Sequence, residues 1–108
     1  MKILTTIREI ENFIESSGMK LLYISRPNCG VCKSLLPMVK MMLRDFPGIE
    51  GAYIDLDKLP EASGRFTIFT IPAILLFIDG KETIREARYV SLKSLKGHIT
   101  RYYSLLHS

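Results

Sequence analysis

The sequence contains no apolar run long enough to cross a lipid bilayer. Its longest run, residues 71–78, is interrupted by Pro72, and a membrane-spanning helix needs about 20 apolar residues. A secretory signal peptide is also missing, because charged residues separate the hydrophobic residues before Met19. From these absences we expect a cytoplasmic protein with no membrane partner.

Glycine and proline are sparse, with seven and five residues in 108, and we find no repeat, low-complexity tract or linker that would divide the chain. Hydrophobic residues make up 47% of the chain, which is enough for one core in a chain too short for two. The net charge of +4 arises from basic residues scattered among acidic ones, which is typical of a mixed solvated surface. We therefore expect a single domain over residues 1–108 that binds no nucleic acid.

The spacing of apolar residues predicts the order of helices and strands. Helices are expected at about 7–16, 31–46 and 92–106, with a short one near 60–66. Strands are expected at 21–25, 51–57 and 72–78, with a short one at 2–4. Asp79 and Gly80 predict a tight turn, after which residues 82–88 pair back as a hairpin. The order predicts an α/β fold with a mixed central sheet of four to five strands and helices on both faces.

The only two cysteines, Cys29 and Cys32, lie in the stretch RPNCGVCK, residues 26–33. This stretch follows the predicted strand at 21–25 and leads into the predicted helix at 31–46. In open α/β sheets, ligands and chemistry are usually found at the carboxyl ends of strands. The cysteine pair is therefore the candidate functional site.

A structural role and a metal-binding role for the pair are both weaker than a redox role. A structural disulfide would need an oxidising compartment, and the two-residue gap closes almost no loop, so the bond would add little stability. A closed zinc site needs about four ligands, but the only histidines, His98 and His107, would lie on roughly opposite faces of the last helix. A thiolate site for a soft ion such as copper is a further alternative. We expect no bound metal.

A redox couple accounts for more of the pattern. The thiol at the start of a helix gains from the positive end of the helix dipole and from unpaired backbone N–H groups. Cys29 would then be the attacking nucleophile, with Lys33 as an additional positive charge that stabilises its thiolate. Cys32, inside the first turn and more covered, would be the resolving thiol. Gly30 allows the tight turn between them.

In this strand-to-helix context the sequence resembles the thioredoxin family over nearly its whole length. The matching features are CGVCK at 29–33, Pro37 inside the helix, Thr70-Ile71-Pro72 before a strand, and the Asp79-Gly80 turn. The resemblance implies the thioredoxin fold, a cis peptide bond before Pro72, and an oxidoreductase that reduces or exchanges protein disulfides. It also implies a thioredoxin-reductase-like electron donor and no bound cofactor.

The resemblance further implies a substrate-binding surface beside the cysteines. In the family, the loop before the cis-proline faces the cysteine pair and offers its backbone to an extended substrate segment. Ile71 and Pro72, together with Gly30 and Val31 between the cysteines, are the residues expected to bind substrate here. An alternative function keeps the fold without catalysis, as an adaptor or metal carrier whose cysteines bind rather than exchange.

Several residues depart from the family pattern near the site. Asn28 stands where thioredoxins usually carry tryptophan, Val31 where they usually carry proline, and Tyr89 where a glycine is common. Because couples on this fold range from about −270 mV to about −120 mV, these departures leave the preferred direction of electron flow open.

The buried acid of the family is also replaced. It lies six residues before the first cysteine, where this chain has Tyr23, and the lysine that often accompanies it falls at about Tyr53. In thioredoxins the acid is thought to help move the proton of the resolving cysteine, so we expect a slower resolving step or a changed preferred direction. Asp55 and Asp57 are nearby substitutes, although capping or surface roles are favoured for both.

Overall fold

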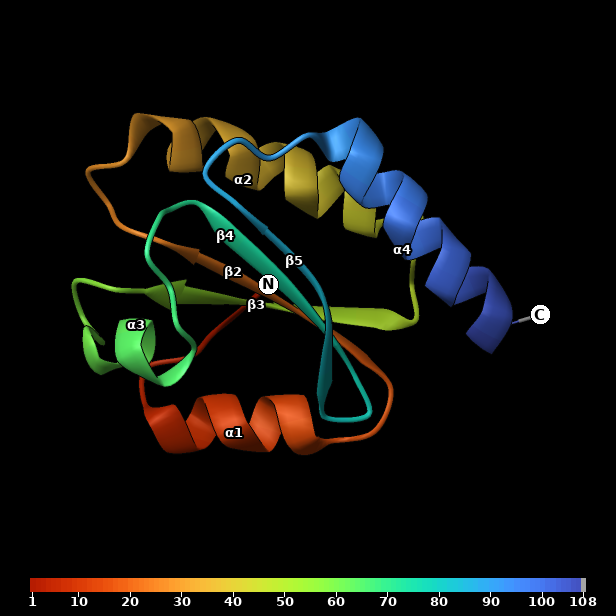
Figure 1. The fold of residues 1–108 in the computed structure, drawn as a ribbon, viewed down its shortest axis with the longest axis horizontal. Helices are drawn as coiled ribbons and strands as arrows, with labels where there is room; N and C mark the ends of the chain where they lie inside the picture. The colour runs from red at the N-terminus through yellow and green to blue at the C-terminus, as the bar shows by residue number, and fades with distance from the viewer. Residues whose placement is uncertain (108) are drawn as a thin grey trace.

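A five-stranded mixed sheet forms the centre of the structure, a computed structural model that describes residues 1–107 (Figure 1). The elements in chain order are β1 (Lys2–Ile3), α1 (Ile7–Glu15), β2 (Met19–Ser25), α2 (Gly30–Leu43), β3 (Ile49–Asp55), α3 (Glu61–Arg65), β4 (Ala73–Ile78), β5 (Lys81–Ala87) and α4 (Leu92–Leu106). The strand order is β1-β3-β2-β4-β5. β1, β3 and β2 are parallel, whereas β4 is antiparallel to both β2 and β5. The predicted fold class is confirmed.

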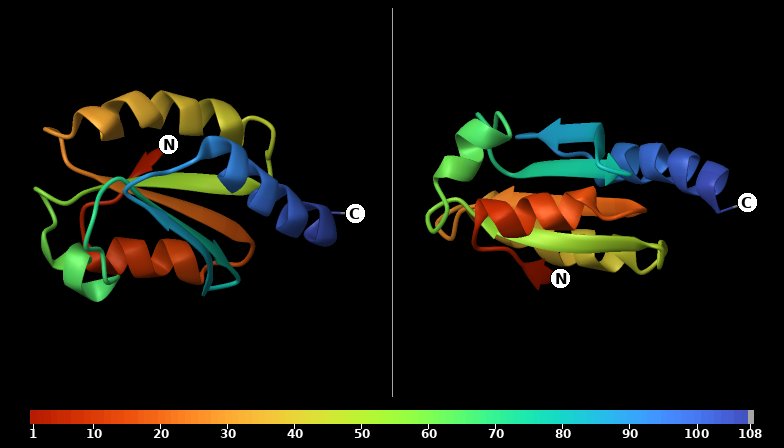
Figure 2. Two further views of the ribbon diagram at one scale, coloured as in Figure 1. Left: turned by 45° about the horizontal axis from the view of Figure 1, so that its top comes forward. Right: turned by 90° about the horizontal axis from the view of Figure 1, so that it is seen from below.

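The sheet separates two hydrophobic cores, because successive side chains of a strand point to opposite faces. On β2, Leu22 and Ile24 pack with residues of α1 and α3, and Leu21 and Tyr23 pack with residues of α2 and α4. Figure 1 shows α1 and α3 on one side of the sheet and α2 and α4 on the other. In the right view of Figure 2, β1 and β5 lie at opposite edges of the sheet. All four of these β2 side chains are fully buried, so β2 is the central strand of both cores.

A local cap begins the first helix, and a local turn joins the last two strands. α1 begins at a capping box in which Thr6 Oγ1 accepts from the Glu9 N–H at 3.0 Å, and the Glu9 carboxylate accepts from the Thr6 N–H at 3.1 Å. Asp79 and Gly80 adopt positive φ values of 49° and 84°, which a two-residue hairpin turn requires at both positions. The hairpin of β4 and β5 is therefore formed as predicted.

The second long helix is shorter than its apolar spacing predicts. α2 ends at Leu43, and the N–H groups of Asp45 and Phe46 bond at 3.0 Å to the carbonyls three residues before them. Phe46 is nonetheless only 5% exposed. The spacing of apolar residues therefore predicted correctly that Phe46 is buried. It predicted wrongly that Phe46 belongs to the helix, because a turn can bury a side chain as well as a helix can.

The third strand is displaced from its predicted range of 51–57. β3 runs from Ile49 to Asp55 because the Asp55 carboxylate accepts from the Asp57 N–H at 2.8 Å and starts a turn there. At its other end β3 pairs with β2 from Ile49 onward. Pro47 and Gly48 directly before it are typical of a turn, so the sequence placed the start of the strand two residues too late.

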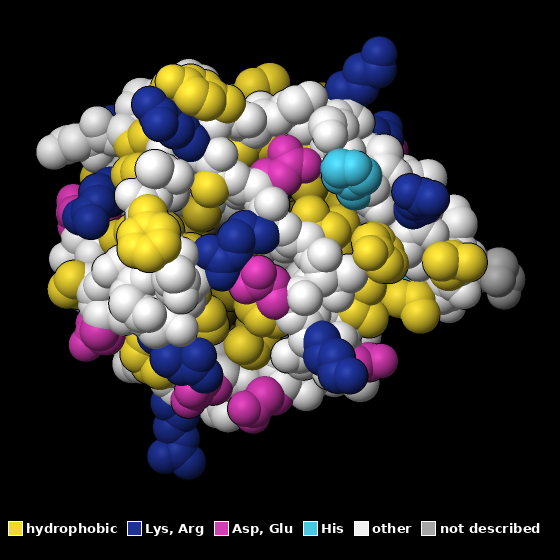
Figure 3. Space-filling model, viewed as in Figure 1, with side chains coloured by type: hydrophobic (Ala, Val, Ile, Leu, Met, Phe, Trp, Pro, Cys, Tyr) yellow, Lys and Arg dark blue, Asp and Glu magenta, His cyan; other side chains and the backbone are white. Residues whose placement is uncertain are grey.

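The surface is mixed in charge and polarity. Figure 3 shows lysine and arginine side chains interspersed with aspartate and glutamate on the face in view. The longest helix, α4, has 15 residues, and no helix within residues 1–107 has the length and apolar character that crossing a bilayer requires.

The buried lysine of β2 gives a pH-dependent prediction. Lys20 Nζ lies 2.7 Å from Glu50 Oε1, and the two side chains are 7% and 66% exposed. The hydrogen bond and charge of Lys20 lower the pKa of Glu50. We expect Glu50→Gln to reduce the free energy of unfolding at neutral pH, by less than about 1 kcal/mol because Glu50 is solvent-screened. The pKa of Glu50 is lower in the folded state than in the unfolded state. The ion pair therefore stabilises the fold above the ordinary glutamate pKa, and this stabilisation is lost as the pH falls through the folded-state pKa of Glu50.

Urea unfolding of the wild type and Glu50→Gln at neutral and acidic pH measures the effect. The matched control is Glu15→Gln, which removes an exposed carboxylate that forms no ion pair within residues 1–107. A difference for Glu50→Gln that is equally large at acidic pH would contradict the assignment to this ion pair.

Candidate active site

The site lies at the edge of the sheet where β2 and β3 end and β4 begins. Pairing of Ile24 with Ala73 places the end of β2 beside the start of β4, and β3 runs parallel to β2. The Arg88 N–H donates to the Pro72 carbonyl at 2.9 Å, which brings the end of β5 to the same edge. The loops that carry the cysteines, the cis-proline and residues 88–91 therefore gather at the carboxyl edge predicted from the strand-to-helix order.

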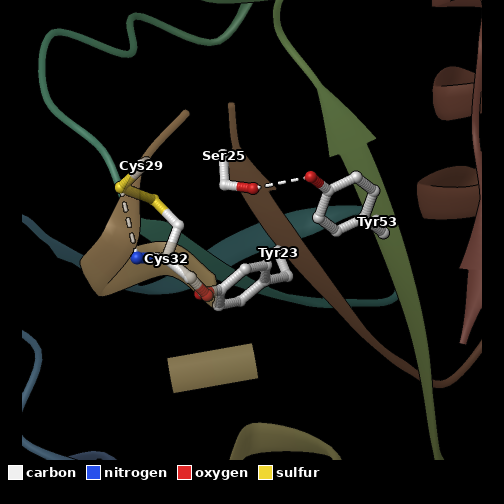
Figure 4. Close-up of a disulfide and its surroundings, with 5 residues drawn as sticks. All are labelled: Tyr23, Ser25, Cys29, Cys32 and Tyr53. Atoms are coloured by element: carbon white, nitrogen blue, oxygen red, sulfur yellow. Dashed lines mark hydrogen bonds between the residues drawn. A yellow bond between two sulfur atoms is a disulfide. The ribbon is translucent and has the colours of Figure 1, made fainter. Parts of the chain in front are cut away.

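Cys29 and Cys32 are joined by a disulfide at the start of α2 (Figure 4). Their Cα atoms are 5.2 Å apart. Cys29 is the N-cap of the helix, and its Sγ accepts a hydrogen bond from the Cys32 N–H at 3.1 Å. Cys29 is half-buried, whereas Cys32 is only 2% exposed. A molecule that approaches the site from outside can therefore contact the sulfur of Cys29 more readily than that of Cys32.

Two tyrosines lie behind the disulfide, on the face of the sheet that α2 covers. Tyr23 and Tyr53 are directly paired on β2 and β3, and their rings stack with centroids 6.1 Å apart. The Tyr23 hydroxyl donates to the Cys32 carbonyl at 2.5 Å, and the Ser25 hydroxyl donates to the Tyr53 hydroxyl at 2.8 Å. Figure 4 shows Tyr23 directed toward Cys32, and Ser25 directed toward Tyr53.

Burial, and secondarily the neighbouring Tyr53, raise the pKa of Tyr23 to about 12. Burial disfavours the phenolate because the low-polarity interior solvates its charge poorly. Tyr23 is therefore a neutral hydrogen-bond donor at physiological pH. It cannot replace a buried carboxylate as a base.

The two aspartates that follow Tyr53 have hydrogen-bonding partners of their own. Asp55 is buried, with 9% exposure, and accepts the Asp57 N–H in the turn that ends β3. Asp57 is paired with Arg26, with 2.7 Å between Oδ1 and Nη1. These contacts fit the capping and surface roles favoured from the sequence.

Comparison with known proteins gives the family. A family model described as Thioredoxin matches residues 2–101. The chain belongs to the thioredoxin family. Among its relatives, the thioredoxin-like protein YdfQ of Bacillus subtilis is 44% identical over 102 residues, which cover 94% of this chain and 91% of that protein. A thioredoxin of Chlamydia trachomatis is 31% identical, over 85% of this chain and 92% of that one.

The fold agrees with solved thioredoxins. The crystal structure of Fasciola hepatica thioredoxin matches with a TM-score of 0.85 and 26% identity, over 94% of this chain and 98% of that chain. Thioredoxins are protein-disulfide oxidoreductases, and this chain has the family's CxxC pair joined as a disulfide. The predicted family, fold and thiol-disulfide oxidoreductase activity are thereby confirmed.

The other predicted site residues of this thioredoxin-family chain lie on the first turn of α2 and in the loop before β4, at the same edge of the sheet. Gly30, Val31 and Lys33 are exposed on the first turn of α2. Ile71 is half-buried and Pro72 is buried, and the peptide bond between them is cis, as the resemblance implied. No group of three or more histidine, cysteine, aspartate or glutamate side chains suited to a metal ion occurs within residues 1–107.

Three features of the site did not emerge from the sequence: the hydrogen-bond partner of Tyr53, the exposure of Phe69, and the contact of Arg88 with Tyr89, a residue already noted as a departure from the family pattern. Ser25 is the partner of Tyr53, and the alternation of β2 would have placed it on the same face as Tyr23. Phe69 is 89% exposed and Tyr89 is 83% exposed, and the guanidinium of Arg88 lies 4.9 Å from the Tyr89 ring centroid. The exposure of Phe69 could not be predicted from the sequence, because a single aromatic residue in a short loop can be either buried or exposed.

Proposed function

We propose that this chain reduces or exchanges protein disulfides by attack from Cys29 and resolution by Cys32. The main support for this proposal is the difference in exposure between the two cysteines of the disulfide at the start of α2. Cys29 is the half-buried N-cap, and Cys32 lies inside the first turn with 2% exposure. The first thiol can reach a bulky substrate, whereas the second can reach only the first.

The reaction proceeds in two exchange steps. The Cys29 thiolate attacks one sulfur of the substrate disulfide, the substrate S–S bond breaks, and the other substrate sulfur leaves as a thiolate. Cys32 then loses its proton to solvent and attacks Cys29 Sγ, which forms the Cys29–Cys32 bond and releases the second substrate thiolate. The substrate gains two electrons, and the protein dithiol is oxidised to the disulfide.

The start of α2 supports the thiolate of Cys29. α2 has 14 residues, and its first N–H groups and positive dipole end face the N-cap. In the disulfide state the Cys32 N–H already donates to Cys29 Sγ at 3.1 Å. The same N–H can stabilise negative charge on that sulfur after reduction, with Lys33 adding positive charge from the exposed side of the turn.

The substrate is an extended segment that lies across the loop before β4. Gly30 and Val31 contact it from the cysteine turn, and Ile71 and Pro72 contact it from the loop, where backbone pairing gives affinity without demanding one sequence. Val31 is 64% exposed and therefore offers apolar area to the segment. The neighbouring aromatic residues, Phe69 and Tyr89, extend this area.

Electrons reach the oxidised protein from a thioredoxin-reductase-like donor, as in the family to which it belongs. No bound cofactor and no nucleic acid take part in this scheme. Residues 1–108 act as one domain, and the compartment is the cytoplasm, where thiols are kept reduced.

A trapping experiment tests the proposal. Cys32→Ser removes the resolving thiol and is expected to accumulate a mixed disulfide between Cys29 and a disulfide-containing peptide, because the second step is blocked. The adduct is measured by intact mass and should disappear on addition of dithiothreitol. The matched control, Cys29→Ser, retains only the buried thiol and should form at least about tenfold less adduct.

Failure of Cys32→Ser to form the adduct would overturn the proposal and favour a binding role for the two cysteines. Equal adduct formation by the two variants would overturn the assignment of Cys29 as the attacking thiol.

A further inference from the structure

The hydroxyl of Tyr23 makes the closest polar contact between the sheet and the cysteine turn. Tyr23 is 0% exposed, and its hydroxyl donates to the backbone carbonyl of Cys32 at 2.5 Å. The ring is held on its other side by stacking on Tyr53. A hydrogen bond to a main-chain carbonyl in the first turn of a helix restrains the backbone that carries the Cys32 side chain.

This contact differs in kind from that of a carboxylate. The Tyr23 hydroxyl has one proton and directs it to the Cys32 carbonyl, so that proton is not available to the thiol. The phenolate that could accept a proton is disfavoured by burial, which raises the pKa of Tyr23 to about 12. Tyr53 is a second phenol, and its oxygen accepts from Ser25. The space behind the disulfide is therefore filled by two hydrogen-bonded phenol groups and by no carboxylate.

We propose that Tyr23 is a positioning residue for the resolving step, and that the tyrosine pair, which brings no carboxylate to the disulfide, leaves the thiols as the groups that set the pH dependence of disulfide reduction. Tyr23 fixes the first turn of α2 so that Cys32 Sγ faces Cys29 Sγ when the mixed disulfide forms. The proposal rests on the function proposed above and concerns its second step.

Other titratable groups lie on the elements that surround the tyrosine pair. Pairing along the sheet runs from Tyr23 through Ile74 to Glu86, and Glu86 Oε2 lies 3.8 Å from His98 Nδ1 on α4. Asp55 follows Tyr53 on the same face of β3, but one of its oxygens accepts the Asp57 N–H. Charged or titratable groups on the elements around the tyrosine pair include Asp55 on β3, Glu86 on β5, His98 on α4, Lys33 and Lys40 on α2, the terminal amino group of Met1, which lines a hollow with Lys40 and Tyr53, and the Arg26–Asp57 ion pair.

The first test separates the two exchange steps in time. Reduced protein is mixed in a stopped-flow instrument with dithiobis(nitrobenzoate), which releases one coloured thiolate on attack by Cys29 and a second on resolution by Cys32. In Tyr23→Phe we expect the second release to be slowed about tenfold through misplacement of Cys32, and the first to change by less than about twofold. The matched control, Tyr53→Phe, loses a hydroxyl from the same stacked pair but keeps the Tyr23–Cys32 contact, so both releases should remain near the wild-type rates.

An unchanged second release in Tyr23→Phe, or an equal slowing in Tyr53→Phe, would overturn the positioning role. A wild type that releases no coloured thiolate would instead contradict the proposed function itself, so the two failures are distinguishable.

The second test uses the wild type and so does not depend on how a variant folds. The equilibrium constant for reduction by dithiothreitol is measured between about pH 5.5 and pH 8.0, where nearly all of the dithiothreitol keeps both protons. We expect a constant value at low pH, and above a single inflection a tenfold change per pH unit in favour of reduced protein, because one thiol ionises. Tyr23→Asp should add a second inflection.

A second inflection in the wild type would overturn the claim that the thiols alone set the pH dependence. Its disappearance in Asp55→Asn or in Glu86→Gln would identify the carboxyl group responsible.

Discussion

Replacement of Cys29 by serine is expected to reduce the turnover of a disulfide substrate by at least about a thousandfold. The reaction needs a thiolate at the N-cap of α2, and a serine hydroxyl in its place stays protonated and cannot form the mixed disulfide. Cys32 cannot take over, since it is only 2% exposed. The measurement is the steady-state reduction of insulin disulfides with dithiothreitol as the terminal reductant.

The control for this prediction is Ser34→Ala on the same helix. Ser34 is exposed, and we expect its replacement to change turnover by less than about twofold. Retention of more than a few per cent of the activity by Cys29→Ser, with Ser34→Ala near the wild type, would contradict the assigned nucleophile.

The largest effect on stability is expected in the central strand. Leu22 is 0% exposed and belongs to the core between the sheet and α1. Leu22→Ala should reduce the free energy of unfolding by about 3–5 kcal/mol, through lost apolar burial and the cavity left behind. That is a large part of the roughly 5–15 kcal/mol typical of a domain. Urea unfolding followed by circular dichroism gives the value.

Leu105→Ala provides the matched control, because Leu105 is 76% exposed on α4. Its replacement should change the free energy of unfolding by less than about 0.5 kcal/mol. Similar losses for the two variants would show that Leu22 does not occupy the core position described above.

The elements with regular periodicity could be predicted from the sequence, and their ends could not. The Asp79-Gly80 turn fixed the hairpin because only a few residue types accept the positive φ values that it requires. The end of α2 was misplaced because Phe46 is buried by a turn, at a spacing that a helix would also have given. The start of β3 was misplaced because Ile49 and Glu50 directly follow Pro47 and Gly48, which are typical of a turn, although both residues pair with β2.

The residues that carry out the redox reaction could be predicted from the sequence, but the tertiary contacts around them could not. Two cysteines between a strand and a helix indicate where the reaction occurs, since their spacing and context are local properties. The hydrogen bond from Tyr23 to the Cys32 carbonyl depends on how closely β2 packs against α2. The exposure of Phe69 likewise depends on the course of the loop before β4. Such tertiary contacts join residues whose relation no short stretch of sequence encodes.

The redox equilibrium of the Cys29–Cys32 pair decides whether the two cysteines act as a dithiol–disulfide couple. Protein equilibrated in buffers of defined thiol to disulfide ratio is quenched with an alkylating reagent, and its free thiols are counted by mass. We expect one transition in which both thiols disappear together, with a reduction potential between about −270 and −120 mV, the span of known couples on this fold. If no intramolecular disulfide formed at any buffer ratio, the oxidoreductase account would be contradicted.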